Sequence, residues 1–215
     1  MTNEKQAREL LTDLAEYTKQ TINETYKKVL TGLQQVQQAW NKHEGTEKEF
    51  YTNCEAYLYD LTLFNLSPGR LEYNKNLSND KTITGRILEY GSGIGQTAIE
   101  YKKNNPKAKL TITDLDCPSY KFSQYRIKKH DYNITTITTT KLENTNTKYD
   151  TILSFDVLEH LDDKEFTKTI ELFKKISHKK TRFIFQICFG KTKLQPMHHE
   201  GSEWKIEKIK ELIKR

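Results

Sequence analysis

Residues 87–98 constrain the fold of this chain more than any other segment. A short apolar run ends at Glu89, and three glycines follow at alternate positions, Gly91, Gly93 and Gly95. Glycine has no Cβ, so it reaches positive φ cheaply and lets the backbone come close to a ligand. The segment therefore predicts a strand that turns tightly into a helix, with a notch of nucleotide size lined by free N–H groups. The alternative is a glycine-rich turn that binds no ligand.

From residue 86 onward, short β-rich runs alternate with helical segments. Strands are expected at 86–90, 109–114, 134–139, 150–155 and 182–188, and helices at 95–104, 118–130, 163–177 and 202–214. This alternation predicts an α/β fold with a doubly wound, mostly parallel sheet. Ligands bind such sheets beyond the carboxyl ends of the strands, where the strand order reverses. The glycine turn after the first strand falls at that place.

The first 66 residues are expected to be helical, since no proline precedes Pro68. Apolar residues recur there at steps of three and four, which predicts one apolar face of a helix or of a pair of helices. Gly45 predicts a helix end, and Thr46 with Glu49 predicts a capping box for a second helix that ends near Pro68. We expect residues 1–66 to form an N-terminal helical extension or lid, and residues 67–215 to form the main domain.

Composition limits the class of protein. Apolar residues make up 35% of the chain and aromatic residues 11%, which is enough for a globular core rich in tyrosine and phenylalanine. No apolar run approaches the roughly 20 residues of a membrane span, and the first residues do not resemble a signal peptide. The three scattered cysteines predict a cytoplasmic location. The formal net charge of +6 permits a nucleic-acid partner. Lysine pairs at expected helix ends nevertheless favour a solvated surface.

A second acidic residue supports a nucleoside ligand. Asp114 ends the second expected strand, 19 residues after Gly95. A carboxylate at this place can accept hydrogen bonds from both hydroxyls of a ribose, and Leu115 offers an apolar face to an adenine ring. An exposed acid at a strand end is the alternative. A dinucleotide-binding turn needs a third glycine where Gln96 stands, so a nicotinamide cofactor is not favoured.

Two motifs carry a resemblance to a known family. The sequence Glu89-x-Gly-x-Gly-x-Gly resembles the first motif of class I S-adenosylmethionine-dependent methyltransferases. Residues 149–161, with the sequence YDTILSFDVLEHL, resemble the fourth-strand signature of the methyltransferases that include the quinone-biosynthesis C- and O-methyltransferases. With Asp114 between them, the motifs stand in the family's order over residues 86–188. The resemblance implies a Rossmann-like methyltransferase fold and S-adenosyl-L-methionine as the cofactor.

The resemblance also implies roles for single residues. Glu89 would brace the turn and the amino group of the cofactor, Phe155 would shape the floor near the sulfonium, and Tyr51 would meet the methionine carboxylate. The expected cofactor-binding residues are Tyr51, Glu89, Gly91, Ser92, Gly93, Gly95, Asp114, Leu115, Lys141, Leu142 and Phe155.

Two departures from the family pattern affect these expectations. The family has an acid after its third strand, at the adenine amino group, and residues 138–143 offer none at that place. The backbone near Lys141 and Leu142, or a threonine hydroxyl, is expected to supply this contact. The family fold also ends with an antiparallel strand pair, whereas residues 204–215 still have a helical pattern. Either the sheet lacks this pair or the sequence is a truncated piece.

The implied chemistry is an in-line displacement at a sulfonium methyl group, which depends mainly on alignment and desolvation. A general base is needed only if the acceptor loses its proton at the same time. His198 and His199, after the fifth strand, are candidates for this base, and His160 is a third. A polar loop and a helix cap are the alternatives for these histidines, and no metal ligands are expected.

Methylation of a small-molecule acceptor is the favoured function. Methylation of RNA or protein is the first alternative, because the net charge is positive. The fourth strand lacks the Asn/Asp-Pro-Pro-aromatic motif of enzymes that methylate base amino groups. A non-catalytic cofactor-binding module is the second alternative. The N-terminal helices are the candidate surface for a homodimer.

Overall fold

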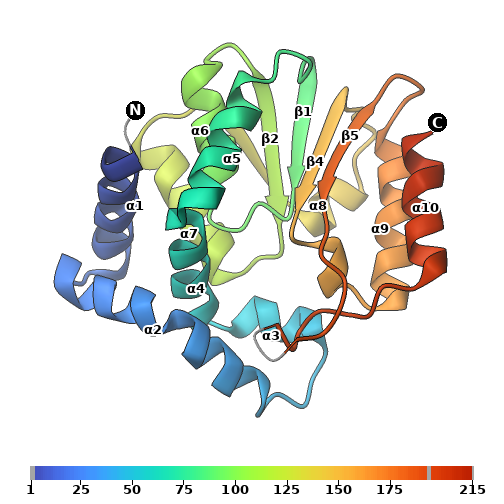
Figure 1. Cartoon of the computed structure of the whole chain (residues 1–215). Helices are drawn as coiled ribbons and strands as arrows, with labels where there is room; N and C mark the ends of the chain where they lie inside the picture. Colours follow the sequence, from blue (N-terminus) through green and yellow to red (C-terminus); the bar gives the residue numbers. More distant parts are fainter. Residues whose placement is uncertain (1–2, 193–194, 215) are drawn as a thin grey trace. The chain divides into compact units, whose positions relative to one another are not determined.

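The structure, a computed structural model, describes residues 3–192 and 195–214 and contains one five-stranded sheet (Figure 1). Its strands are β1 (Arg86–Tyr90), β2 (Lys109–Asp114), β3 (Ile134–Thr138), β4 (Thr151–Phe155) and β5 (Arg182–Gln186). The order is β3-β2-β1-β4-β5, and every neighbouring pair is parallel. The expected doubly wound parallel sheet is thus confirmed, and the described residues add no antiparallel pair. The strand order reverses between β1 and β4, where such sheets bind ligands.

The segments that join and follow the strands are mainly helical, as expected. They are α6 (Gln96–Asn104), α7 (Pro118–Lys129), α8 (Thr139–Glu143), the 3₁₀ turn η1 (Leu158–His160), α9 (Asp163–Ile176) and α10 (Glu203–Ile213). The short helix α8 was not predicted. It begins because the Thr138 side chain accepts a hydrogen bond from the Lys141 amide, and this N-cap ends β3.

Within residues 3–85, five helices precede the sheet: α1 (Asn3–Thr18), α2 (Ile22–Trp40), α3 (Glu47–Asn53), α4 (Ala56–Leu66) and α5 (Pro68–Asn79). The capping box of Thr46 and Glu49 is confirmed. The single helix expected after it is wrong, because Cys54 adopts an extended conformation and separates α3 from α4. A second capping box, of Thr21 and Glu24, starts α2 and was missed.

The chain divides into two compact units. The first comprises Met1–Asp80, Gly93–Pro106 and Asp116–Asn133, and the second comprises Lys81–Ser92, Lys107–Leu115 and Ile134–Arg215. The sheet, α8, α9 and α10 belong to the second unit. The sequence predicts a boundary between residues 66 and 67, which separates a helical extension or lid from the main domain. A division into compact units does not test this functional boundary, so it stays a prediction.

Each unit has its own apolar core. In the first unit, Leu10 and Leu14 of α1 pack with Val29 of α2, and with Leu58 and Phe122. In the second unit, the apolar faces of α9 and α10 cover the sheet face that carries Leu88, Tyr90 and Ile152. Side chains alternate between the two faces of a strand, so Ile87 and Glu89 of β1 point to the opposite face.

Candidate functional site

The glycine turn begins at the end of β1 and is fastened to the end of β2. The amides of Gly91 and Ser92 both donate to the Thr113 carbonyl, at 2.9 and 3.1 Å. This places Gly91 and Ser92 beside Asp114, the residue expected to hold a ribose. These two amides are hydrogen-bonded within the protein and are not free for a ligand. The predicted notch of free N–H groups is therefore wrong for Gly91 and Ser92.

Gly91 is also fixed by the segment that follows β4. Its φ is +74°, and a Cβ added there would lie 2.2 Å from Cγ2 of Val157. Only glycine fits a left-handed conformation that is also covered so closely. The turn therefore contacts both β2 and the residues after β4.

The other two glycines of the turn belong to the first unit. Gly93 and Gly95 have φ of +52° and +72°, and Gly95 is the N-cap of α6. The predicted positive φ values are thus confirmed. The carbonyl of Ile94 accepts a hydrogen bond from Arg126 at 3.1 Å. Tyr51 lies in the same unit, where its ring contacts Phe50 and Tyr57.

Asp114 closes β2 with a partly buried carboxylate. Its Oδ1 accepts the amide of Leu115 at 2.7 Å, which fixes the side chain at the strand end. Leu115 is itself partly exposed and offers apolar surface next to the carboxylate. Glu89 is buried in β1, where it stands in register with Ile112 on one side and Leu153 on the other.

The remaining expected contacts differ in what they can offer a ligand. The side chain of Leu142 is fully buried in the core of the second unit, so only its backbone can reach a ligand. The amide of Lys141 already caps α8 through Thr138. Phe155, the last residue of β4, is buried.

The three candidate histidines lie close together in the second unit. The rings of His160 and His198 meet edge to face, with centroids 4.5 Å apart. The segment after β5 is held to η1 by Glu159, whose carbonyl accepts the His199 amide at 2.8 Å and whose Oε1 accepts the Cys188 amide at 2.9 Å. Glu159 thus anchors the segment after β5 to η1 through both its backbone and its side chain.

Burial weakens two of these imidazoles, those of His160 and His198, as bases. Burial lowers the pKa of His160 to about 3, and the charges of His198 and His199 lower it as well. Burial also lowers the pKa of His198, although a hydrogen bond with the Cys188 backbone opposes the shift. A base is most effective when its pKa lies near the working pH. The catalytic role of all three histidines stays a prediction.

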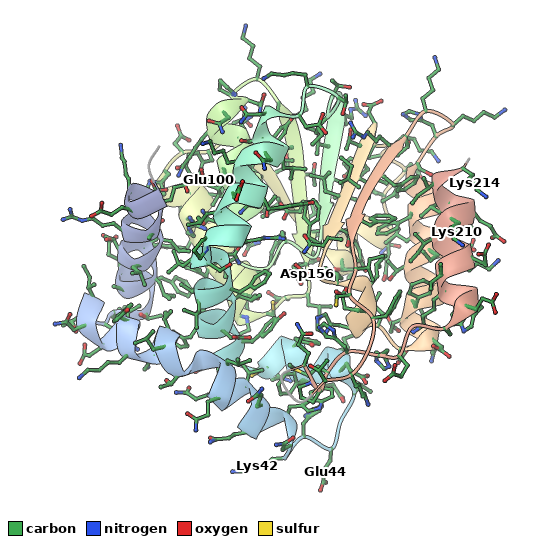
Figure 2. The ribbon with its side chains drawn as sticks, viewed as in Figure 1. Lys42, Glu44, Glu100, Asp156, Lys210 and Lys214 are labelled. Carbon is green, nitrogen blue, oxygen red and sulfur yellow. The ribbon has the colours of Figure 1, made fainter. Side chains whose placement is uncertain are left out.

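Sequence reasoning missed two residues at this edge of the sheet. Asp156, which is labelled in Figure 2, directly follows β4 with a φ of +55°. Its amide donates to the Gln186 carbonyl at 3.0 Å. Val157 covers Gly91. The acidic residue at a strand end was a usable signal for Asp156, whereas the contact of Val157 is visible only in the fold.

Comparisons with known proteins agree with this arrangement. Residues 88–177 match a family model described as a methyltransferase domain. Comparison with curated protein sequences gave no match. None of the helices in the described residues is long and apolar enough to cross a membrane.

Among solved structures, PigF with SAH is 14% identical, with a TM-score of 0.62 over 94% of this chain and 67% of that one. Mitomycin 7-O-methyltransferase MmcR is 12% identical, with a TM-score of 0.59 over 88% and 60%. An O-methyltransferase family protein from Burkholderia thailandensis is 12% identical, with a TM-score of 0.56 over 75% and 57%. The chain thus spans about three fifths of the length of MmcR, and at these identities the likeness concerns the fold.

Proposed function

We propose, from the premise that residues 88–177 form a class I S-adenosylmethionine-dependent methyltransferase domain, that this chain transfers a methyl group to a small-molecule acceptor. The observation that carries the proposal is the double hydrogen bond from Gly91 and Ser92 to Thr113, which sets the turn beside Asp114. A glycine turn next to a strand-end carboxylate suits a nucleoside with a free ribose. The names of MmcR and of the Burkholderia protein support a small acceptor with an oxygen nucleophile.

The proposed cofactor contacts follow the sequence expectations. Asp114 accepts the ribose hydroxyls, and Leu115 offers its exposed apolar surface to the adenine ring. Glu89, the glycines of the turn and Ser92 serve the methionine part, together with Tyr51, while Phe155 forms the floor. The proposed contact with the adenine amino group comes from the backbone near Lys141 and Leu142 or from a threonine hydroxyl. Leu142 can offer only its backbone, because its side chain is buried.

The proposed reaction is an in-line displacement, so the chain contributes alignment and exclusion of water more than proton transfer. An acceptor that is already deprotonated, or that loses its proton after the transfer, needs no base. For an acceptor that does need one, His198 or His199 is the proposed base. The low pKa of His160 disfavours this residue in that role.

Ligand-dependent unfolding tests the cofactor. A ligand at 100 times its Kd stabilises the folded chain by about 2.7 kcal/mol, which raises the Tm by roughly 5–10 °C for a chain of this length. S-adenosylhomocysteine should give such a rise, NAD should not, and Asp114→Asn should remove most of it. Asp116→Asn is the control, because Asp116 is an exposed acid two positions further on. The absence of any rise with the wild-type chain would refute the proposed function.

Assays of methyl transfer and of RNA binding distinguish the proposed small-molecule methyltransferase from a non-catalytic module and from an RNA methyltransferase. Methyl transfer to small hydroxylated acceptors is expected from the enzyme, whereas a non-catalytic module would bind S-adenosylhomocysteine and give no product with any acceptor class. The net charge of +6 is the observation that favours RNA. Binding of tRNA that weakens steeply with salt, together with methylation of it, would favour that alternative.

A homodimer through α2 completes the proposal. Ile22, Tyr26 and Leu30 follow each other at steps of four and are 51%, 48% and 53% exposed. Such steps place them on one face of the helix. A two-fold axis at Tyr26 would set Ile22 opposite Leu30 of the partner subunit, so the same stripe is complementary to a second copy of itself.

A further inference from the structure

The amino ends of four neighbouring strands carry a dense group of positive charges in the second unit. The segments that lead into β1, β2, β4 and β5 are 81–86, 107–109, 146–150 and 177–182, at the upper edge of the sheet in Figure 1. They contain one acid, Asp150, and eight lysines and arginines. All eight are exposed, and we call them the basic edge: Lys81, Arg86, Lys107, Lys109, Lys148, Lys179, Lys180 and Arg182.

Hydrogen bonds between the strands hold the basic edge in one row. Arg86 of β1 is in register with Lys109 of β2. On the other side, the Arg86 carbonyl accepts the Asp150 amide at 2.8 Å, and the Asp150 carbonyl accepts the Arg182 amide at 2.9 Å. Neighbouring strands lie about 4.8 Å apart, so these four residues span about 14 Å. The basic residues therefore share one continuous edge.

The acid in this row does not neutralise the lysines around it. Its Oδ2 accepts the Arg86 amide at 2.6 Å, and its Oδ1 contacts Nε2 of His178 at 3.0 Å. These hydrogen bonds hold the pKa of Asp150 below its ordinary value, so it stays ionised. Among the described residues, five lysines of the basic edge take part in no ion pair: Lys81, Lys107, Lys109, Lys179 and Lys180. Like charges gathered on one edge repel one another, so a bound polyanion lowers the free energy of this arrangement.

The side chains around these charges favour a duplex nucleic acid over a membrane or a single strand. In the part of the chain that the structure describes, the exposed large apolar side chains lie on α2, α4 and α10, so the basic edge has none to insert between lipids. Tyr149 is buried, and the His178 ring is bonded to Asp150. Unpaired bases therefore find no open aromatic surface on which to stack.

We propose that the basic edge binds a duplex segment of RNA through its phosphates. Turns and strand starts form this edge, whereas reading the major groove of B-DNA needs a helix or a two-stranded ribbon that enters the groove. Duplex RNA is instead recognised across its shallow minor groove, by contacts to phosphates and 2′-hydroxyls. Thr84 is exposed between Lys81 and Arg86 and can hydrogen-bond to such a hydroxyl.

The bound RNA is a docking partner and not the methyl acceptor. β2 runs from Lys109 at the basic edge to Asp114 beside the glycine turn. At about 3.3 Å per residue, these two ends of the strand lie about 17 Å apart. A short duplex on the basic edge thus stays away from the proposed cofactor site. The inference goes beyond the proposed function and does not depend on methyl transfer.

Fluorescence anisotropy of a labelled RNA duplex of about 16 base pairs tests this surface on the full-length chain. The Kd should be about 10⁻⁶–10⁻⁴ M and should rise steeply with salt. Two double variants each remove two phosphate contacts: Lys107→Gln with Lys109→Gln, and Lys179→Gln with Lys180→Gln. Each should weaken binding about tenfold and reduce the slope of log K against log salt by about 2.

The matched control is Lys42→Gln with Lys48→Gln, which removes the same charge from two exposed lysines of the first unit (Lys42 is labelled in Figure 2). It should bind RNA as the wild type does, and circular dichroism checks that each variant is folded. No binding by the wild type, or an equal loss in the control, would overturn the inference. Equal binding of a DNA duplex of the same sequence would overturn the choice of RNA. Binding of anionic vesicles without binding of RNA would show that the partner is a membrane.

The thermal shift with S-adenosylhomocysteine, measured without RNA, keeps this inference apart from the proposed function. A shift without RNA binding would refute only the basic edge. RNA binding without a shift would refute only the methyltransferase proposal. Methyl transfer to the bound duplex would contradict the docking role, because the RNA would then reach the reacting end of the sheet.

Discussion

At the scale of single residues, Gly91 is a position where the fold requires glycine. It combines a φ of +74° with a side chain, Val157, that occupies the place of a Cβ. Gly91→Ala should cost about 2–4 kcal/mol, the sum of left-handed strain and overpacking. The midpoint of urea denaturation measures this loss.

A matched pair of variants tests the cause. Gly69 lies in α5 with nothing within 4 Å of an added Cβ, so Gly69→Ala should leave the stability unchanged or raise it slightly. Adding Val157→Ala to Gly91→Ala should recover part of the loss by removing the clash. Equal losses at both glycines would show that the contact with Val157 does not matter.

Residue patterns identified much of the glycine turn in advance. Glu89, the glycines and Asp114 are local signals, because each stands at the end of a recognisable strand. The bond between the Glu159 side chain and the Cys188 amide joins positions 29 residues apart, and no spacing rule predicts it. The same bond draws Cys188 out of the strand expected to reach residue 188, so β5 ends at Gln186.

At the scale of elements, a buried ion network joins α1 to α7 and to the glycine turn. Asp13 of α1 and Arg126 of α7 are each 1% exposed and pair at 3.3 Å, while Arg126 also donates to the Ile94 carbonyl. Removing one partner of a buried pair costs about 3–5 kcal/mol, because the other charge is left uncompensated. We expect Asp13→Asn to destabilise the first unit by that amount and to increase hydrogen exchange in the turn. Glu4→Gln, at an exposed acid on the same helix, should change little.

The pH dependence of this network has a definite sign. Burial raises the pKa of Asp13, but hydrogen bonds from Lys129 and His130 and the charge of Arg126 lower it more, so the folded value lies below the ordinary one. The stabilisation is therefore complete above the unfolded pKa, about 3.9, and is lost as the pH falls through the folded pKa. Stability curves of the wild type and Asp13→Asn should converge in acid. A constant gap down to pH 2 would contradict this account.

Element boundaries were predictable where local chemistry fixes them. The capping box of Thr46 and Glu49 marks the start of α3, and β1 and β2 have their expected ends. The break at Cys54 was not predictable from the apolar pattern, because the apolar residues continue through it. The cap of α8 at Thr138 was hidden in a threonine run that fits a strand equally well.

At the scale of the whole molecule, the oligomeric state tests the proposed dimer. The surface proposed for it is the exposed apolar stripe of Ile22, Tyr26 and Leu30 on α2. Apolar side chains of this size on one helix face lower the free energy when a second copy covers them. The wild-type chain should sediment as a dimer at micromolar concentration, and Leu30→Glu should shift it to the monomer, because a buried carboxylate without a partner is costly. Ile213→Glu is the control, since Ile213 of α10 is 54% exposed and lies outside the stripe. A wild-type monomer, or equal dissociation by both variants, would exclude α2 as the dimer surface.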